Sequence, residues 1–131
     1  MKNEQLPLHG GGKALRSFIH MNDVSRATYL ILKNGCNGDI YHISGGETIS
    51  IRQLVAQICS FMDVAMEKVV CDADQRAGSD SKYFLNSEKI KKELNWKPMV
   101  SFSDGLTETI EWAKNNFEVL KNLPMEYMHK G

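Results

Sequence analysis

Three glycines followed by two basic side chains form the stretch of this sequence best suited to chemistry. The stretch runs from Leu6 to Asp23 and reads LPLHGGGKALRSFIHMND. Because glycine has no Cβ, the backbone at 10–12 can turn with positive φ and approach another group closely. Arg16 follows as a planar, permanently charged fork whose N–H groups suit phosphate oxygens. The stretch therefore predicts a flexible turn that leads to an anion-binding arginine.

Two familiar phosphate-binding motifs do not fit this turn. A P-loop requires G-x-x-x-x-G-K-[ST], but here Ala14 follows Lys13 and the glycines are consecutive. A dinucleotide fingerprint requires G-x-G-x-x-G after a buried strand, and residues 9–13 (HGGGK) do not supply it. We therefore expect no nicotinamide cofactor at this turn, and a purely structural turn stays an alternative for the glycines.

Length and composition indicate one ordinary globular domain spanning 1–131. The chain has 131 residues, of which 42% are hydrophobic and 24% are charged. Sixteen basic and sixteen acidic residues cancel, whereas a nucleic-acid-binding domain normally carries a basic surface. No run of about 18 apolar residues predicts a membrane span, and the polar start MKNEQ does not resemble a signal peptide. We expect neither a nucleic acid nor a membrane as partner.

The cysteines and histidines give no spacing for a metal site. Cys36, Cys59 and Cys71 lie far apart, and the four histidines are equally scattered. An odd number of cysteines without a secretion signal favours reduced thiols and a cytoplasmic location.

Short strands and helices must position the candidate residues. Pro7 suits an extended edge segment. Asn22 or Asp23 is predicted to cap the start of a helix that ends at a capping glycine, Gly35. Residues 39–44 (DIYHIS) have the composition of a short strand.

The clearest helix begins with a capping box formed by Ser50 and Gln53. It continues with an apolar stripe made up of Ile51, Leu54, Val55, Ile58 and Met62. The last helix is predicted to begin at Ser103, because Asp104 then complements the helix dipole. Such an arrangement predicts an α/β fold in which helices outnumber strands.

Between these helices the sequence predicts a second strand and a polar loop. Residues 68–71 (KVVC) have a strand-like composition, and residues 72–83 form a polar, glycine-containing loop. Arg76 is the only residue of that loop with obvious chemistry. A short helix is predicted to begin at Asn86 or Ser87.

Several blocks of the sequence resemble the NAD-dependent sugar-nucleotide dehydratases and epimerases of the extended short-chain dehydrogenase/reductase family. The blocks are LPLHGGG, ALRSFIHMNDV, IYHISGG, DQRAGSDSKYFLNSEKIKKELNWKP and SFSDGLTETIEWAKNNF. They run through nearly the whole chain and are most similar to the dTDP-glucose 4,6-dehydratase branch. The resemblance implies a small helix-rich α/β domain with a few short strands, namely the C-terminal substrate domain without the Rossmann half.

The resemblance also implies a role for five residues. Pro7 and His9 fall on the segment that lines the base pocket, and Arg16 falls on the arginine that binds the diphosphate. Arg76 falls on the arginine of an R-P-G loop that approaches the nucleotide from the other side. His42 stands where the family has an asparagine that contacts the nucleotide.

The physical properties of the two arginines agree with these roles. Two guanidinium groups on one diphosphate would form charge-assisted, bidentate hydrogen bonds. The alternative is that Arg16 and Arg76 are solvated or pair with acidic side chains at little energetic gain. The sequence departs from the family pattern at two positions: Ala77 replaces the proline of the R-P-G loop, and His42 replaces the asparagine. His42 is equally compatible with a structural role as a strand histidine.

The catalytic parts of the family are not expected in this chain. The family's chemistry requires a Rossmann half that binds NAD and a tyrosine and lysine four positions apart. Tyr29 and Lys33 have that spacing but follow the arginine motif, in the wrong segment. We therefore expect no catalytic residue and no cofactor here, with NAD bound only in a full-length relative.

The resulting hypothesis is an inactive fragment that binds a dTDP- or UDP-hexose. Two alternatives stay open: a fragment of a UDP-sugar epimerase or decarboxylase, and a non-catalytic module that self-associates through exposed apolar surface. Its expected macromolecular partners are a second copy of the chain or a separate chain that supplies the NAD-binding half.

Overall fold

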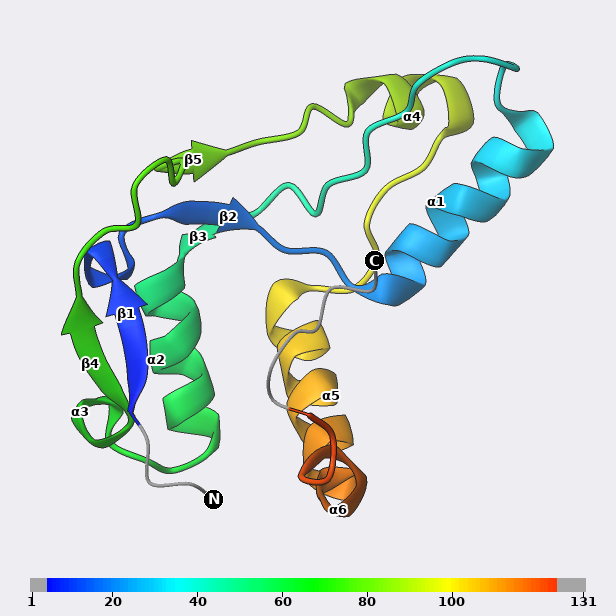
Figure 1. The fold of residues 1–131 in the computed structure, drawn as a ribbon. Coiled ribbons are helices and arrows are strands. Elements are labelled where there is room, and N and C mark those ends of the chain that lie inside the picture. The colour runs from blue at the N-terminus through cyan, green and yellow to red at the C-terminus, as the bar shows by residue number, and fades with distance from the viewer. Residues whose placement is uncertain (1–4, 125–131) are drawn as a thin grey trace.

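The computed structural model describes residues 5–124, which form a mixed α/β fold rich in helices (Figure 1). The elements in chain order are β1 (Leu6–His9), the 3-10 turn η1 (Gly10–Gly12), β2 (Leu15–Ser17), α1 (Met21–Asn34), β3 (Thr48–Ser50), α2 (Ile51–Phe61), α3 (Met66–Val69), β4 (Val70–Ala73), β5 (Lys82–Tyr83), α4 (Glu88–Leu94), α5 (Phe102–Asn115) and α6 (Phe117–Leu120). The predicted fold class is confirmed. No helix in this part of the chain has the length and hydropathy to span a membrane.

Two small sheets connect the helices. In the first, β1 and β4 are parallel, with the Cα of Leu6 opposite Val70 and that of His9 opposite Ala73. In the second, β2 lies between β3, which is antiparallel to it, and β5, which is parallel. Because β1 and β4 run in the same direction, both end at one edge of their sheet. The glycine turn η1 and the loop 74–81 therefore begin side by side.

Helix α2 begins with the predicted capping box. The hydroxyl of Ser50 accepts a hydrogen bond from the Gln53 amide at 3.1 Å, and the Gln53 side chain accepts one from the Ser50 amide at 2.9 Å. Two of the otherwise unpaired N–H groups near the helix start are satisfied in this way. The helix contacts the glycine turn η1 and the short helix α3, at one end of the molecule (Figure 1).

The most deeply buried side chains lie at the other end, around α1 and α4 (Figure 1). Ala27, Ile90 and Trp96 are at most 1% exposed and form one cluster. Partly buried side chains surround it, namely Ile19, Leu30, Ile31, Tyr41, Ile43 and Leu94.

The predicted N-cap of α1 is wrong by two or three residues. The helix begins at Met21, and His20 is its N-cap, with Nδ1 accepting a hydrogen bond from the Asn22 amide at 3.3 Å. Asp23 does not cap the helix because its carboxylate is engaged elsewhere. Gly35 does end the helix as predicted, although with φ −73° and not in the left-handed conformation.

Asp23 is buried, and it joins α1 to the segment between α4 and α5. Its carboxylate accepts hydrogen bonds from the Met99 and Val100 amides at 3.0 Å and from Arg26 at 2.7 Å. Its main-chain carbonyl accepts another from the indole N–H of Trp96 at 3.2 Å. The carboxylate thus satisfies two amides that would otherwise lack partners.

Two strand predictions also need correction. Residues 39–44 belong to no strand, because no other segment of 5–124 pairs with them, although Tyr41 and Ile43 pack against the core. At 66–69 the chain forms the short helix α3, so the second strand begins at Val70. The last long helix, α5, begins at Phe102, and Ser101 caps it in place of Ser103.

Candidate functional site

The five residues predicted to bind a nucleotide lie on four segments of the fold. Pro7 is exposed in β1, and His9 ends the same strand, half-buried. Arg16 is half-buried in β2. Arg76 is exposed in the loop 74–81, which joins β4 to β5. His42 is exposed in the unpaired segment after α1.

The structure brings the loop 74–81 against His9 and Arg16. The ring Nδ1 of His9 lies 2.8 Å from the carbonyl oxygen of Asp74, at the start of the loop. Near its end, the Arg16 guanidinium donates to the Asp80 carbonyl at 3.0 Å. The next loop carbonyl, that of Ser81, accepts a hydrogen bond from the main chain of β2 at 2.9 Å. Two of the predicted residues thus contact the loop that carries a third.

Arg76 lies in a tight turn in the middle of this loop. The Ser79 amide donates to the Arg76 carbonyl at 3.2 Å, and the Ser79 hydroxyl donates to the same oxygen at 2.8 Å. Gly78, the third residue of the turn, has φ +74°, as a type II turn requires. Ala77 occupies the second position, where proline is favoured, so hydrogen bonds alone close the turn here.

Neither candidate arginine is neutralised by an acidic side chain of the described residues. Arg16 uses two of its five N–H groups on carbonyls, those of Leu15 at 2.7 Å and Asp80. Arg76 forms no side-chain hydrogen bond or ion pair within 5–124. Pairing with acids therefore does not account for either residue, and both keep N–H groups free for an anion.

His42 is not joined to the other four residues. Its side chain has no hydrogen-bond partner in the described part of the chain. It precedes Ser44 by two positions, and the Ser44 hydroxyl is 2.9 Å from that of Ser17, the neighbour of Arg16. This link connects the backbone segments of the two residues, but no contact of the His42 side chain within 5–124 assigns it a role.

Sequence reasoning missed the side chains that hold the glycine turn. Arg52 donates from Nε to the Gly11 carbonyl at 2.8 Å and pairs with the Asp72 carboxylate at 2.9 Å. Gly12 has φ +68°, and a Cβ there would lie 2.8 Å from a Leu8 methyl and 2.9 Å from the Arg52 amide. The close approach explains the need for glycine at this position. The contacts of Arg52 with Gly11 and Asp72 could not be predicted because the three residues are far apart in the sequence.

The turn does not fit a dinucleotide. In a dinucleotide-binding turn the glycines open a helix whose N-terminal amides receive the pyrophosphate. Here η1 leads through Lys13 and Ala14 into the strand β2. The residues described at this turn therefore offer no site for NAD. Among residues 5–124, no three His, Cys, Asp or Glu side chains converge as metal ligands.

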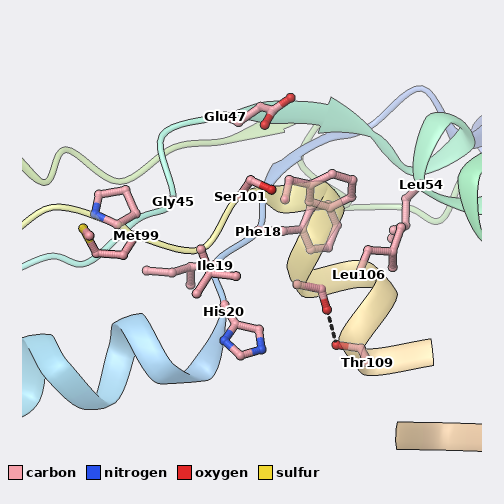
Figure 2. A pocket seen from close by; sticks show the side chains of 14 residues that line it. Phe18, Ile19, His20, Gly45, Glu47, Leu54, Met99, Ser101, Leu106 and Thr109 are labelled. Atoms are coloured by element: carbon pink, nitrogen blue, oxygen red, sulfur yellow. Dashed lines mark hydrogen bonds between the residues drawn. The ribbon is translucent and has the colours of Figure 1, made fainter. Parts of the chain in front are cut away.

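A separate groove of about 450 Å³ lies between α5 and the segment that joins β2 to α1 (Figure 2). Its walls include Phe18, Ile19, Leu54, Phe102 and Leu106, and the rings of Phe18 and Phe102 are 5.8 Å apart between centroids. None of the five predicted residues lines it. The groove is mostly apolar and does not suit a diphosphate.

Outside the arginine site and the apolar groove, polar and charged side chains connect α4 to the segment 39–41. Lys89 lies 3.0 Å from the Asp39 carboxylate, whose hydrogen bond raises the pKa of the ammonium group. The Tyr41 hydroxyl donates to Glu93 at 2.8 Å. A hydrogen bond from the Cys36 amide lowers the pKa of Tyr41. The hydrogen bond to Glu93, the charge of Glu93 and desolvation together raise this pKa by more, so the net shift is upward.

Comparison with known proteins gives consistent matches. The family model described as GDP-mannose 4,6 dehydratase matches residues 1–109. A dTDP-glucose 4,6-dehydratase from Streptomyces niveus is 37% identical over 116 residues, which cover 88% of this chain and 34% of that protein. The chain thus spans about a third of the length of the curated relatives it matches.

Two solved structures show the same fold. The dTDP-glucose 4,6-dehydratase DesIV from Streptomyces venezuelae, solved with NAD bound, has a TM-score of 0.83 and 36% identity, covering 88% of this chain and 35% of its own. The UDP-glucose 4-epimerase from Thermotoga maritima, solved with UDP-glucose, has a TM-score of 0.79 and 27% identity, covering 88% of this chain and 37% of its own.

Proposed function

Because the chain belongs to the GDP-mannose 4,6-dehydratase family, we propose that it is the substrate-binding part of a dTDP-glucose 4,6-dehydratase-like enzyme. In this proposal it holds the diphosphate of a nucleoside-diphosphate hexose. The observation that carries the proposal is the placement of Arg16 and Arg76. One guanidinium group contacts the loop 74–81, the other belongs to it, and no acidic side chain of the described residues neutralises either.

Arg16 and Arg76 would have different roles in binding the diphosphate. Arg16 is half-buried, and two carbonyls fix the orientation of its guanidinium group, so it loses little conformational freedom when a phosphate arrives. Arg76 is exposed and closes on the diphosphate from the loop. Each forms charge-assisted hydrogen bonds, which are about twice as strong as neutral ones. Pro7 and His42 are proposed to contact the nucleotide next to this site.

We propose that the chain alone does not turn substrate over. The family's hydride chemistry depends on NAD, but the glycine turn of this chain does not fit that cofactor. The role left to these residues is to bind and orient the nucleotide, so that the hexose is held in place for chemistry performed by another part of the protein or by another chain. Detection of dehydratase turnover by the purified chain with NAD would contradict this.

Replacing Arg76 by glutamine tests the proposal with little risk to the fold. The side chain has no partner among residues 5–124, so the free energy of unfolding should change by less than about 0.5 kcal/mol. Loss of a charge-assisted hydrogen bond, worth about 1.5–3 kcal/mol, should weaken the affinity for dTDP or UDP at least tenfold. Isothermal titration calorimetry with each nucleotide measures this effect and also shows which of the two bases the chain prefers.

A matched control removes a distant charge. Lys97 is exposed in the segment between α4 and α5, and Lys97→Gln should leave the affinity within twofold of the wild type. Equal loss in the two variants would mean that only net charge matters. Unchanged affinity in Arg76→Gln would remove Arg76 from the site.

A second candidate function is self-association, and exposed apolar side chains favour it. Met21, Tyr29 and Leu32 of α1 are 67%, 56% and 83% exposed, and Ile40, in the segment after α1, is 73% exposed. Large apolar side chains left exposed in this way are typical of interaction sites. A separate chain that supplies the NAD-binding half is the alternative occupant of this face.

Sedimentation velocity tests self-association directly. If α1 mediates it, the wild-type chain should sediment as a dimer or larger species, and Leu32→Glu should shift it to monomer, because a charge is costly to bury in an apolar interface. Leu123→Glu, a matched change at another exposed leucine, should keep the wild-type sedimentation. A monomeric wild-type chain at 100 micromolar (roughly the range of weak interfaces) would exclude this function.

A further inference from the structure

His9 has a contact that a base-pocket residue would not need. Its ring Nδ1 lies 2.8 Å from the carbonyl oxygen of Asp74. A carbonyl only accepts hydrogen bonds, so Nδ1 must carry the proton and donate. Because β1 and β4 are parallel and end together, the last side chain of β1 reaches the first loop residue after β4. The contact is therefore a consequence of the strand pairing.

The loop 74–81 has few other means of holding its shape. All of its residues are exposed, so apolar burial contributes little to its position. Inside the loop, the Gln75 side chain lies against Gly10 and donates to the Ser79 hydroxyl at 3.3 Å. The Ser79 amide and hydroxyl close the turn on the Arg76 carbonyl. The entry of the loop is fixed by His9, and its exit by Arg16 and by the pairing of β2 with β5.

We propose that His9 is a positioning residue, which fixes the main chain at Asp74 and thereby presents Arg76 to the diphosphate. It acts through the loop and does not contact the base. This inference rests on the proposed function for the role of Arg76, whereas the anchoring of the loop is independent of any ligand.

Two substitutions of His9 distinguish the contribution of its N–H donor from that of its ring. His9→Phe keeps a planar ring and removes the N–H. His9→Asn places an amide N–H one bond beyond Cγ, where Nδ1 stands in histidine. With His9→Phe, amide hydrogen exchange of Ser79 in the free chain should become about fivefold faster, the change expected for loss of one neutral hydrogen bond. The affinity for dTDP should fall by about the same factor, and His9→Asn should restore both values.

A double-mutant cycle with Arg76→Gln tests whether His9 acts through Arg76. If it does, His9→Phe in the Arg76→Gln background should lower the dTDP affinity by less than twofold. Full additivity of the two losses would show that His9 acts independently of Arg76 and overturn the proposal. Unchanged Ser79 exchange in His9→Phe would overturn it as well.

Amide hydrogen exchange of Ser79 tests the anchoring of the loop by His9 independently of nucleotide binding. If the wild-type chain does not bind dTDP or UDP but His9→Phe speeds the exchange of Ser79 and His9→Asn restores it, the anchor stands and the diphosphate role of Arg76 fails. If the chain binds dTDP but exchange is insensitive to His9, the binding proposal stands and the anchor fails.

Discussion

Replacing Asp23 by alanine is expected to lower the free energy of unfolding by about 3 kcal/mol or more, because it leaves two main-chain amides without an acceptor, at about 1–3 kcal/mol each. Asp23 is 1% exposed, and its carboxylate accepts hydrogen bonds from two main-chain amides and from Arg26. These part-buried amides are those of Met99 and Val100, in the segment between α4 and α5. Urea denaturation followed by circular dichroism measures the change.

Two companion variants identify the cause of this loss. Asp23→Asn keeps one acceptor oxygen and the size of the side chain, so it should cost less, about 1–2 kcal/mol. Arg26→Ala should cost less than about 1 kcal/mol, since the side chain of Arg26 is 44% exposed. A cost for Arg26→Ala equal to that for Asp23→Ala would assign the stability to the ion pair and not to the hydrogen bonds with the two amides.

Replacing Gly45 by alanine is expected to destabilise the chain by about 3 kcal/mol, the upper part of the range for overpacking. A Cβ at this position would overlap the main-chain carbonyl of Phe18, and backbone cannot move aside as a flexible side chain can. Phe18 in turn packs on Phe102 of α5, so the displacement would reach the apolar groove (Figure 2). Thermal unfolding followed by calorimetry gives the change.

The neighbouring glycine is the natural control. Gly46 has φ +85°, and a Cβ added there would meet no atom within 4 Å. Gly46→Ala should therefore cost only the strain of the left-handed conformation, about 1–2 kcal/mol. A larger loss in Gly46→Ala than in Gly45→Ala would mean that backbone strain, and not the contact with Phe18, sets the requirement for glycine in this pair.

Local patterns predicted the helices well because their signals are local. The capping box at Ser50 forms both of its expected hydrogen bonds. The N-caps of α1 and α5 were misplaced by two or three residues, and the cause at α1 is informative. Asp23 has the side chain of an N-cap, but amides 76 and 77 positions away recruit its carboxylate. A contact over that separation leaves no trace in a short sequence window.

Strand prediction failed where it depended on a partner. Residues 39–44 have the composition of a strand, yet a strand needs a second segment to satisfy its main-chain groups, and none of the described residues provides it. The pairing of β1 with β4, distant in the sequence, was equally invisible in the sequence pattern. That pairing is what places His9 beside the loop of Arg76.

The family itself could be recognised from motifs, and the comparisons confirm it. The motifs also selected Arg16 and Arg76 as candidates, and the structure places the first against the loop that contains the second. What the sequence did not predict is how that loop is held. The diphosphate role of the two arginines, and the roles of Pro7, His9 and His42, stay proposals that binding measurements address.

Amide chemical-shift mapping by NMR tests the central claim most directly. The chain labelled with nitrogen-15 is titrated with dTDP and, in parallel, with thymidine, which lacks the diphosphate. We predict saturable shifts at residues 15–17 and 74–82 with dTDP and none with thymidine, because the guanidinium groups bind the phosphates. Absence of shifts with dTDP, or shifts confined to the groove around Phe102 and Leu106, would contradict the claim that this loop and strand bind a nucleoside diphosphate.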